Sequence, residues 1–517
     1  PPPANYAEDG HVNVYYGNKG EGIVTTGGDL TVTASGDVYM DSDLSIGGDL
    51  SLKAGYKEGE DKPAAGSEAV LDISNIGQVR ANGDEDAALS YLNEFLTHFA
   101  DGTHNITLGG DKTKIAVDMW GGDSFNLQKY DLSDEEKDTL AYKLNQLYIN
   151  GETGKGKDYT YIWVSTGEQL AGIQDYKDKH QDSNILSYNF ALKNDIDASN
   201  VQGYKAIGTE SAYTGTFDGR DNRIIGLDTT KTSDGSGQTL TNAGIFDTIG
   251  ADGTVEDLRV YSGTFSGKTN AGAVAGVNNG KISNVTAFGN VVEVLGNEGT
   301  AGGIVGTNST TNAENIAVIN NVTAIGAVTV GEGDSASGVE AVAGGVAGYN
   351  GENSEIRGSS SNSAVNASAG NATALGGVVG LNEGTLDNVD SLGVTTGIYR
   401  GDETKYSHYV GGITGSNHGT VNNAYNESIV SGDNNVGGII GANSGTVFNV
   451  ANASSVTGEG DANAEQDEDK ISHYVGGLAG SNSGTITNGR NNGEITGNNY
   501  VGGLVGSNGA ESTLTNF

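Results

Sequence analysis

The chain has 517 residues, a formal net charge of −39, 84 glycines, 4 prolines and no cysteine. This length exceeds one compact core, and the charge disfavours binding to nucleic acid or anionic membranes. No stretch approaches the roughly 20 apolar residues that cross a bilayer, and the absence of a Gly-x-y period excludes collagen. The lack of cysteine fits a secreted bacterial protein that avoids disulfides, and it fits cytosolic proteins as well.

The first 70 residues contain a short internal repeat. GGDLTVTA (Gly27–Ala34) returns as GGDLSLKA (Gly47–Ala54). Alternating apolar residues broken by Gly-Asp corners predict short strands stacked as coils. We therefore assign 1–70 to N-terminal β-helix coils, and note that Pro1 opens a segment without targeting features.

Helical excursions are predicted next, within a β-helix region at 71–160 and at the start of the following region. The first has an acidic lead-in at 84–86, and its apolar face is Leu89, Leu92, Phe95, Leu96 and Phe99. Capping boxes predict two more helices, one from Ser133 with Glu136 and one from Ser165 with Glu168. Charged, Gly-rich loops are expected at 57–66 and 151–158.

Residues 161–270 are assigned to a β-helix region that precedes the repeats, and 271–517 to the repeats themselves. The repeats share a phrase, Gly-Gly-aliphatic-small-Gly-x-Asn, which occurs eight times between AGAVAGVN (Ala271–Asn278) and VGGLVGSN (Val501–Asn508). Its shortest spacing is 26 residues, and longer spacings contain insertions. A constant unit with variable insertions is typical of a solenoid.

Each position of the phrase has a predicted structural use. We expect the phrase to be the first of three strands in a coil, with its aliphatic residue in the core. That residue is Val274, Ile304, Val346, Val378, Ile413, Ile439, Leu478 or Leu504. The last position is predicted to form an asparagine ladder between coils, made of Asn278, Asn308, Asn350, Asn382, Asn417, Asn443, Asn482 and Asn508.

A second asparagine follows in most copies, at a predicted corner. It is Asn284, Asn321, Asn388, Asn423, Asn449, Asn488 or Asn516. The third copy reads Glu355-Ile356-Arg357-Gly358 instead, so we expect a distorted coil or a loop there. The chain ends partway through a ninth coil, which predicts that the natural protein continues.

These patterns predict an all-β fold: an elongated right-handed parallel β-helix with three strands per coil and a few short helical excursions. A leucine-rich repeat lacks its Leu-x-x-Leu-x-Leu pattern here, and a calcium roll lacks its Gly-Gly-x-Gly-x-Asp nonapeptides. Both halves of the chain are expected to form one rod.

Candidate chemistry is sparse. Asp195, Asp197, Asp218 and Asp221 are either paired carboxylates of a glycan-cleaving β-helix or turn formers, and they also make calcium a possible ligand. His408 and His473 occupy equivalent repeat positions, as metal or sugar contacts or as outer-face residues. The tyrosines placed at insertions or corners are surface-contact candidates or end-of-strand packing residues; they are Tyr349, Tyr406, Tyr409, Tyr425, Tyr474 and Tyr500. We expect no catalytic, cofactor-binding or metal-binding residue.

The repeated phrase resembles the GLUG motif of bacterial surface proteins. The segment Tyr161–Leu227, with YNFALKNDIDAS and YTGTFDGRDNRIIGL, is similar to what precedes GLUG repeats, and Ala87–Gly110 resembles the helix-then-strand unit of filamentous haemagglutinin-like adhesins exported by two-partner secretion. The Asn-Pro-Asn signature of the secretion domain is missing. GLUG repeats also resemble regions of IgA-cleaving zinc peptidases, whose His-Glu-x-x-His is missing too.

The resemblance implies a non-enzymatic adhesin segment, secreted or on the surface of a Gram-negative-type bacterium. Its expected partners are a host or bacterial surface protein or glycan, or biofilm matrix, and an outer-membrane transporter during export, without nucleic acid or direct membrane insertion. The contact regions are predicted in the insertions 331–341, 396–408 and 461–473. The alternatives are a β-helical polysaccharide lyase or hydrolase, and the stalk of a larger exported toxin or haem-scavenging effector.

Overall fold

The computed structural model describes residues 5–6, 12–15, 23–56, 62–100, 102–121, 124–125, 143–144, 146–153, 156–181, 183–295, 299–312, 314–331, 341–367, 374–397, 409–459 and 474–517. The chain divides into two compact units. The first comprises 1–164 with 189–191, and the second 165–188 with 192–517. The single rod expected from the sequence stays a prediction.

The first unit is a stack of parallel strands interrupted by helices. One ladder contains β2 (Val12–Tyr15), β5 (Val38–Asp41), β8 (Glu68–Asp72), β10 (Lys112–Val117) and β13 (Thr160–Val164). A second pairs β3 (Ile23–Thr26) with β6 (Asp43–Ile46), and a third contains β4 (Leu30–Thr33), β7 (Leu50–Lys53) and β9 (Ile106–Gly109). The remaining elements are β1 (Asn5–Tyr6), α1 (Gln78–Ala81), α2 (Glu85–His98), β11 (Trp120–Gly121), β12 (Ser124–Phe125) and α4 (Gly156–Tyr159).

The short repeat at the N-terminus pairs with itself as predicted. Leu30 lies opposite Leu50 and Val32 opposite Leu52, so the two copies of the GGDL sequence occupy successive coils. The first helical excursion is confirmed as α2, whose N-cap Asp84 accepts a hydrogen bond from the Ala87 amide. The capping box at Ser133 lies outside the described residues.

The second unit begins with α5 (Gly167–His180) and the 3-10 helix η3 (Ser183–Ser187). The predicted capping box is one residue out of register: Thr166, rather than Ser165, is the N-cap and accepts from the Gln169 amide at 3.1 Å. Gln169 in turn accepts from the Ser165 amide at 2.7 Å, so Gln169 replaces Glu168 in the box.

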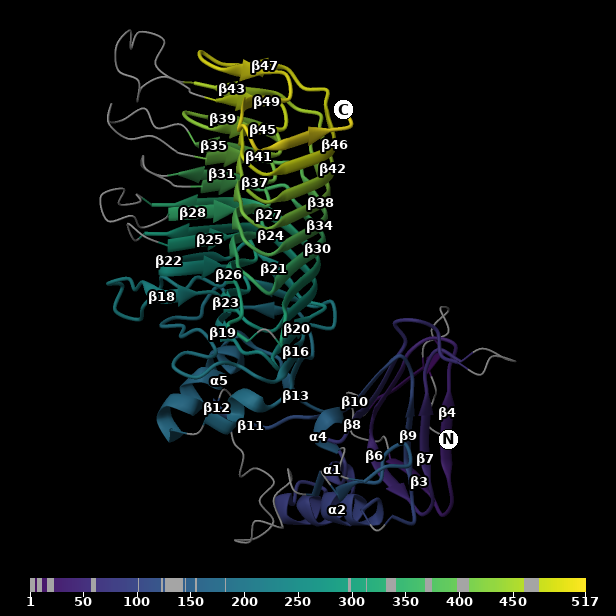
Figure 1. The fold of residues 1–517 in the computed structure, drawn as a ribbon. Helices are drawn as coiled ribbons and strands as arrows, with labels where there is room; N and C mark the ends of the chain where they lie inside the picture. The colour runs from purple at the N-terminus through teal and green to yellow at the C-terminus, as the bar shows by residue number, and fades with distance from the viewer. Residues whose placement is uncertain are drawn as a thin grey trace. The chain divides into compact units, whose positions relative to one another are not determined.

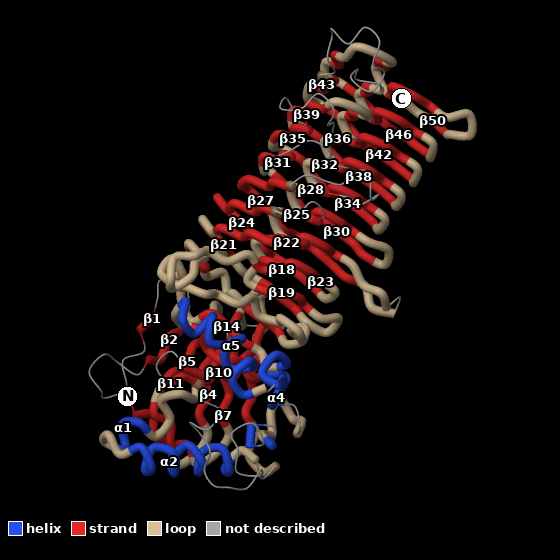
Figure 2. Tube along the Cα trace, turned by 90° about the vertical axis from the view of Figure 1, so that its left-hand side faces the viewer, coloured by secondary structure: helices blue, strands red, loops and turns tan. Residues whose placement is uncertain are grey.

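The lead-in strands of this unit are short. They are β14 (Phe190–Leu192, where the division between units falls), β15 (Ile196–Asp197), β16 (Thr216–Asp218), β17 (Arg223–Ile225), β18 (Leu240–Ala243), β19 (Phe246–Ile249), β20 (Thr254–Glu256), β21 (Arg259–Tyr261), β22 (Thr264–Gly272) and β23 (Ala275–Asn278). Figures 1 and 2 show α5 at the end of the stack that β18 and β19 continue.

The repeats form parallel coils in register. The first two coils each have three strands: β24 (Lys281–Val294), β25 (Gly299–Gly302) and β26 (Val305–Asn308), then β27 (Ala317–Val330), β28 (Ala341–Gly344) and β29 (Ala347–Asn350). In later coils the long strand divides, since β27 pairs with both β30 (Ser354–Ser361) and β31 (Ala364–Ala367). The parallel β-helix predicted from the sequence is therefore present (Figure 1).

The same arrangement continues to the C-terminus. The strands that follow are β32 (Ala374–Gly376), β33 (Val379–Asn382), β34 (Thr385–Ser391), β35 (Val394–Gly397), β36 (Tyr409–Gly411), β37 (Thr414–Asn417), β38 (Thr420–Asn426), β39 (Ile429–Gly432), β40 (Val436–Gly437), β41 (Ile440–Asn443), β42 (Thr446–Asn452), β43 (Val456–Gly458), β44 (Val475–Gly476), β45 (Ala479–Asn482), β46 (Thr485–Asn491), β47 (Ile495–Thr496), β48 (Val501–Gly502), β49 (Val505–Asn508) and β50 (Thr513–Thr515). One nine-stranded parallel sheet contains β19, β23, β26, β29, β33, β37, β41, β45 and β49.

The repeated phrase is not one strand, contrary to the prediction. In the copy at 475–482 it is split into β44 and β45 by a bend at Gly477 and Leu478. A Cβ on Gly476 would lie 2.0 Å from the Ala479 carbonyl oxygen, because the backbone folds back on itself there. The bend turns the aliphatic residue inward, and Leu478 is buried.

The coil of the third copy is in register at this corner, and the connection that precedes it, 351–353, is one residue longer than the equivalent 383–384 of the next coil. Gly358 occupies the register position of the corner asparagines and has φ +55°, close to the +55° of Asn284 and the +54° of Asn388. What this corner requires is the left-handed backbone, which both glycine and asparagine adopt at low cost.

Candidate ligand-binding groove

The eight asparagines that end the phrase form one continuous stack in the structure. Each amide donates from Nδ2 to Oδ1 of its equivalent in the next coil, at 2.8 Å in all seven steps from Asn278 to Asn508. The first seven side chains are buried. A stack that uses both ends of every amide holds the coils together and leaves no group for chemistry.

A second interior stack was missed from the sequence. Asn426 donates to Asn452, and Asn452 donates to Asn491, each at 2.8 Å. The same column contains Ser361 and Ser391 in the preceding coils. The sequence could have indicated this stack, because the position lies three residues after the corner residue in every coil.

The second glycine of the phrase makes room for this stack. A Cβ on Gly412 would lie 2.4 Å from Asn426 Cγ, and one on Gly438 would lie 2.5 Å from Asn452 Cγ. The glycines therefore serve backbone packing, and none forms a phosphate-binding loop.

A groove runs along the outside of the nine-stranded sheet, across β37, β41, β45 and β49. It encloses about 420 Å³. Its lining residues are Ala374, Leu381, Tyr409, Ser416, His418, Ala442, Asn443, Ser444, Ser481, Asn482, Ser483, Ser507 and Gly509. Most of them carry a hydroxyl or an amide.

Three of the predicted contact tyrosines belong to one column beside this groove. The register of Val410, Val436, Val475 and Val501 places Tyr409, Tyr474 and Tyr500 in line, with Asn435 between the first two. Tyr409 lines the groove and is half-buried, whereas Tyr500 is 64% exposed. The Tyr474 and Tyr500 rings lie 5.2 Å apart between centroids.

The other predicted contacts are dispersed. The Tyr349 hydroxyl donates to Glu383 Oε2, and the Tyr425 hydroxyl donates to Glu427 Oε1 at 2.9 Å on another strand. Tyr406, His408 and His473 lie outside the described residues, as does most of the insertions 331–341, 396–408 and 461–473.

The four candidate aspartates have structural partners of two kinds. Asp195 forms an ion pair with Arg223 at 2.6 Å, and Asp221 forms one with Arg259 at 3.2 Å, both with residues distant in sequence. Asp197 accepts from the Ser199 amide and Asp218 from the Arg220 amide, at 3.0 and 2.7 Å, and these two contacts are those of turns. No described group of three or more His, Asp or Glu residues could hold a metal ion.

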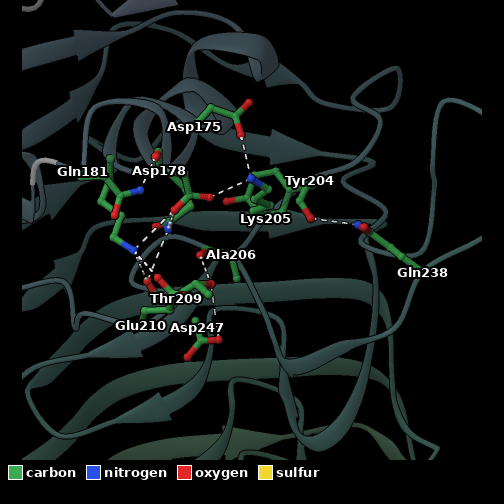
Figure 3. Close-up of polar contacts among 12 residues, drawn as sticks. Asp175, Asp178, Gln181, Tyr204, Lys205, Ala206, Thr209, Glu210, Gln238 and Asp247 are labelled. Atoms are coloured by element: carbon green, nitrogen blue, oxygen red, sulfur yellow. Dashed lines mark hydrogen bonds and ion pairs between the residues drawn. The ribbon is translucent and has the colours of Figure 1, made fainter.

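Ionisable groups also gather between α5 and the segment 204–210 (Figure 3). Lys177 Nζ lies 3.0 Å from Glu210 Oε2, and Lys205 Nζ lies 2.7 Å from Asp178 Oδ2. Burial opposes the charge on Asp178, but hydrogen bonds from Lys205, Gln174 and Lys177 outweigh it and lower its pKa. Gln174 Oε1 also accepts from the Gly208 amide at 3.0 Å. This α5 cluster fastens the helix to the first coils, which is a structural role.

Comparisons with known proteins match only parts of the chain. No family model matches it. A stretch of 95 residues is 35% identical to Halomucin of Haloquadratum walsbyi (strain DSM 16790 / HBSQ001), and this stretch is 18% of the chain and 1% of Halomucin. The chain also has structural similarity to a proposed immunoglobulin A1 protease from Bacteroides ovatus, with a TM-score of 0.41 and 20% identity, over 54% of this chain and 78% of that one. In the described residues, no helix has the length and apolar character needed to span a bilayer.

Proposed function

We propose that this chain is a segment of a secreted or cell-surface bacterial adhesin of the GLUG-repeat, filamentous haemagglutinin-like type. In this proposal the coils of the second unit are a stiff scaffold that presents its insertions and its groove to a surface protein or glycan of a host, another cell or a biofilm matrix. Export through an outer-membrane transporter belongs to the same proposal.

One observation carries the proposal: variation in length is greatest at one corner of the coil. The three longest connections between repeat strands are 331–340, 398–408 and 459–474, and each precedes the strand that opens the phrase. The equivalent connection between β39 and β40 is only 433–435. The contacts between coils are made at positions that recur in each repeat. A connection outside those positions can therefore vary in length without disturbing the stack.

The same corner adjoins the groove. Tyr409 and Tyr474 come directly after the connections 398–408 and 459–473. The described ends of these connections and the tyrosine column therefore lie at one corner of the coil, as a contact surface requires.

The proposal is tested with beads coated with the full chain and incubated with bacterial cells, epithelial cells and isolated biofilm matrix. We expect attachment to at least one of them. Replacing 459–473 by the short sequence 433–434 keeps the residue before β44 and should reduce attachment at least several-fold, while circular dichroism stays unchanged. Beads that attach to none of the three surfaces would leave this segment a passive spacer, as expected for the stalk of a larger effector.

A further inference from the structure

We infer that the groove across β37, β41, β45 and β49 binds a linear chain of neutral sugars. The inference deepens the proposed function, on which it rests for its biological setting. The groove is built from one register column of side chains, one wall that contains tyrosine, and a row of corner residues.

The groove forms where the side chains of one register column change from large to small. Successive coils place Tyr349, Leu381, Ser416, Ala442, Ser481 and Ser507 at the same position. The column is bulky at Tyr349 and Leu381 and small from Ser416 onward. Leu381 therefore closes one end, and the floor beyond it is lower and rich in hydroxyl groups.

The two sides of the groove differ in chemistry. Tyr409 and Ala374 line the side toward β36 and β32, and Tyr474 and Tyr500 continue that column toward the last coil. The other side has the corner residues His418, Ser444 and Ser483. Ser416 Oγ and His418 Nε2 lie 3.1 Å apart, so the imidazole is held at the rim.

The lining excludes most other ligand classes. Among the described residues that line the groove, His418 is the single basic side chain, and the whole chain carries a net charge of −39, so an anionic polymer would be repelled. A hydrophobic ligand would leave the floor hydroxyls desolvated. An added peptide strand has no free ladder, because β41 is paired with both β37 and β45.

A neutral saccharide matches what remains. Serine hydroxyls both donate and accept hydrogen bonds, as sugar hydroxyls do, and a tyrosine presents an apolar ring face with a polar tip. The lining repeats once per coil, at the strand spacing of about 4.8 Å. A hexose unit is of comparable length, so a linear oligosaccharide can place successive rings over successive coils.

The test is titration calorimetry of the full chain with cellohexaose, maltohexaose, mannohexaose and chitohexaose, with hexagalacturonate as the charged comparator. We expect binding of at least one neutral hexamer and none of hexagalacturonate. Ser481→Leu refills the floor with the residue that the column already accepts at Leu381, and it should weaken binding at least tenfold. Tyr409→Ala should weaken it as well.

The matched control is Ser431→Leu, the same change in a different column that contains Thr396 and Thr457. It should bind like the original protein. Failure of all four neutral hexamers, tighter binding of hexagalacturonate, or equal loss in Ser431→Leu would each overturn the inference.

The bead assay separates this result from the proposed function. If cells are bound but sugars are not, the adhesin proposal stands and the groove inference is wrong. If sugars are bound with the expected sensitivity to Ser481→Leu but no surface is bound, the groove inference stands and the adhesin proposal is wrong.

Discussion

The first unit contains a buried link between coils that occurs once, whereas the repeats of the second unit use the same link in every coil. Asp72 is fully buried in the first unit and accepts from the Tyr39 hydroxyl at 3.0 Å and from Trp163 Nε1 at 2.8 Å, which links strands β5, β8 and β13. In the repeats, the link between coils is the asparagine stack, with equal 2.8 Å bonds at each step.

The difference predicts how each region fails. A single-use contact concentrates stability in one place, so its loss should loosen several strands together. A repeated contact spreads stability over nearest neighbours, so its loss should stay local. Hydrogen–deuterium exchange on the full chain follows each segment separately, which a single global unfolding free energy does not.

The largest effect is expected for Asp72→Ala. The change leaves the Trp163 indole and the Tyr39 hydroxyl without this acceptor in the interior, and should cost about 3 kcal/mol. Exchange should accelerate in β5, β8 and β13 and stay unchanged in the repeats. Asp72→Asn keeps an acceptor oxygen and should lose much less; equal losses for both variants would contradict this account.

Overpacking in the repeats should come next. Gly438→Ala adds a Cβ where the Gly477 carbonyl oxygen would be 2.2 Å away and Asn452 Cγ 2.5 Å away, and should cost about 1–3 kcal/mol. Asn452→Ala in the same protein should restore part of this loss, since it removes the side-chain half of the clash. The first copy carries alanine at both equivalent positions, Ala273 and Ala287.

A double-mutant cycle of Gly438→Ala and Asn452→Ala tests whether the two changes interact. Strictly additive exchange effects of the two changes would show that glycine at 438 and the interior stack are unrelated.

Removal of one amide from the ladder should be milder and local. Asn443→Ala takes a partner from both Asn417 and Asn482, at a cost of about 1–2 kcal/mol. Exchange should rise in β37, β41 and β45 only. The outward-facing Asn422→Ala is the control, and a loss of protection through the whole stack would break the comparison between the units.

The α5 cluster should respond to pH at both extremes. The pKa of Asp178 is lowered in the folded protein, so its contribution is present above its ordinary value of 3.8 and is lost as pH falls through the folded value. The pKa of Lys177 is raised, because hydrogen bonds and charges from Glu210 and Asp178 outweigh burial, so its contribution is complete below 10.5 and is lost as pH rises through the folded value.

Protection of α5, corrected for intrinsic exchange, should therefore be flat between these limits and fall outside them. Asp178→Asn should remove the loss of α5 protection at low pH. If α5 protection instead changed with a midpoint near neutral pH, groups other than Asp178 and Lys177 would control this helix.

The smallest effect is expected when a corner asparagine is replaced by glycine. Asn449→Gly should change stability by less than about 0.5 kcal/mol, because Gly358 already occupies this column at φ +55°. Asn449→Val places a β-branched residue in the left-handed region and should cost about 1–3 kcal/mol. Equal effects of the two changes would mean that the amide bonds, rather than the backbone angle, determine the corner.

Most of the coil could be predicted from the sequence because its contacts repeat in register. The shared positions of Asn278 to Asn508 indicated a stack, and the pairing of Leu30 with Leu50 followed from the repeated GGDL sequence. Local capping was less predictable, since Thr166 rather than Ser165 is the N-cap of α5 and both residue types are common at that position.

The candidate groove could not be predicted in the same way. The tyrosines stood out as exposed aromatic residues, but serines such as Ser416 and Ser481 carry no signal in a chain of this composition. Ser416 and its equivalents form a groove floor only because the bulkier Leu381 lies in the same column one coil before Ser416. Residues far apart in sequence become neighbours only through the stacking register.

The repeating unit could be predicted without coordinates: a buried aliphatic residue, glycines at close backbone approaches, and amides that bond along the stack. These are local requirements, and the residues that meet them recur in each repeat. The tertiary structure alone decided the bend that divides the phrase, the interior stack against the second glycine, and the groove across four coils. Each of these depends on distances between adjacent coils, which are fixed by hydrogen-bond register and side-chain volume rather than by any one residue.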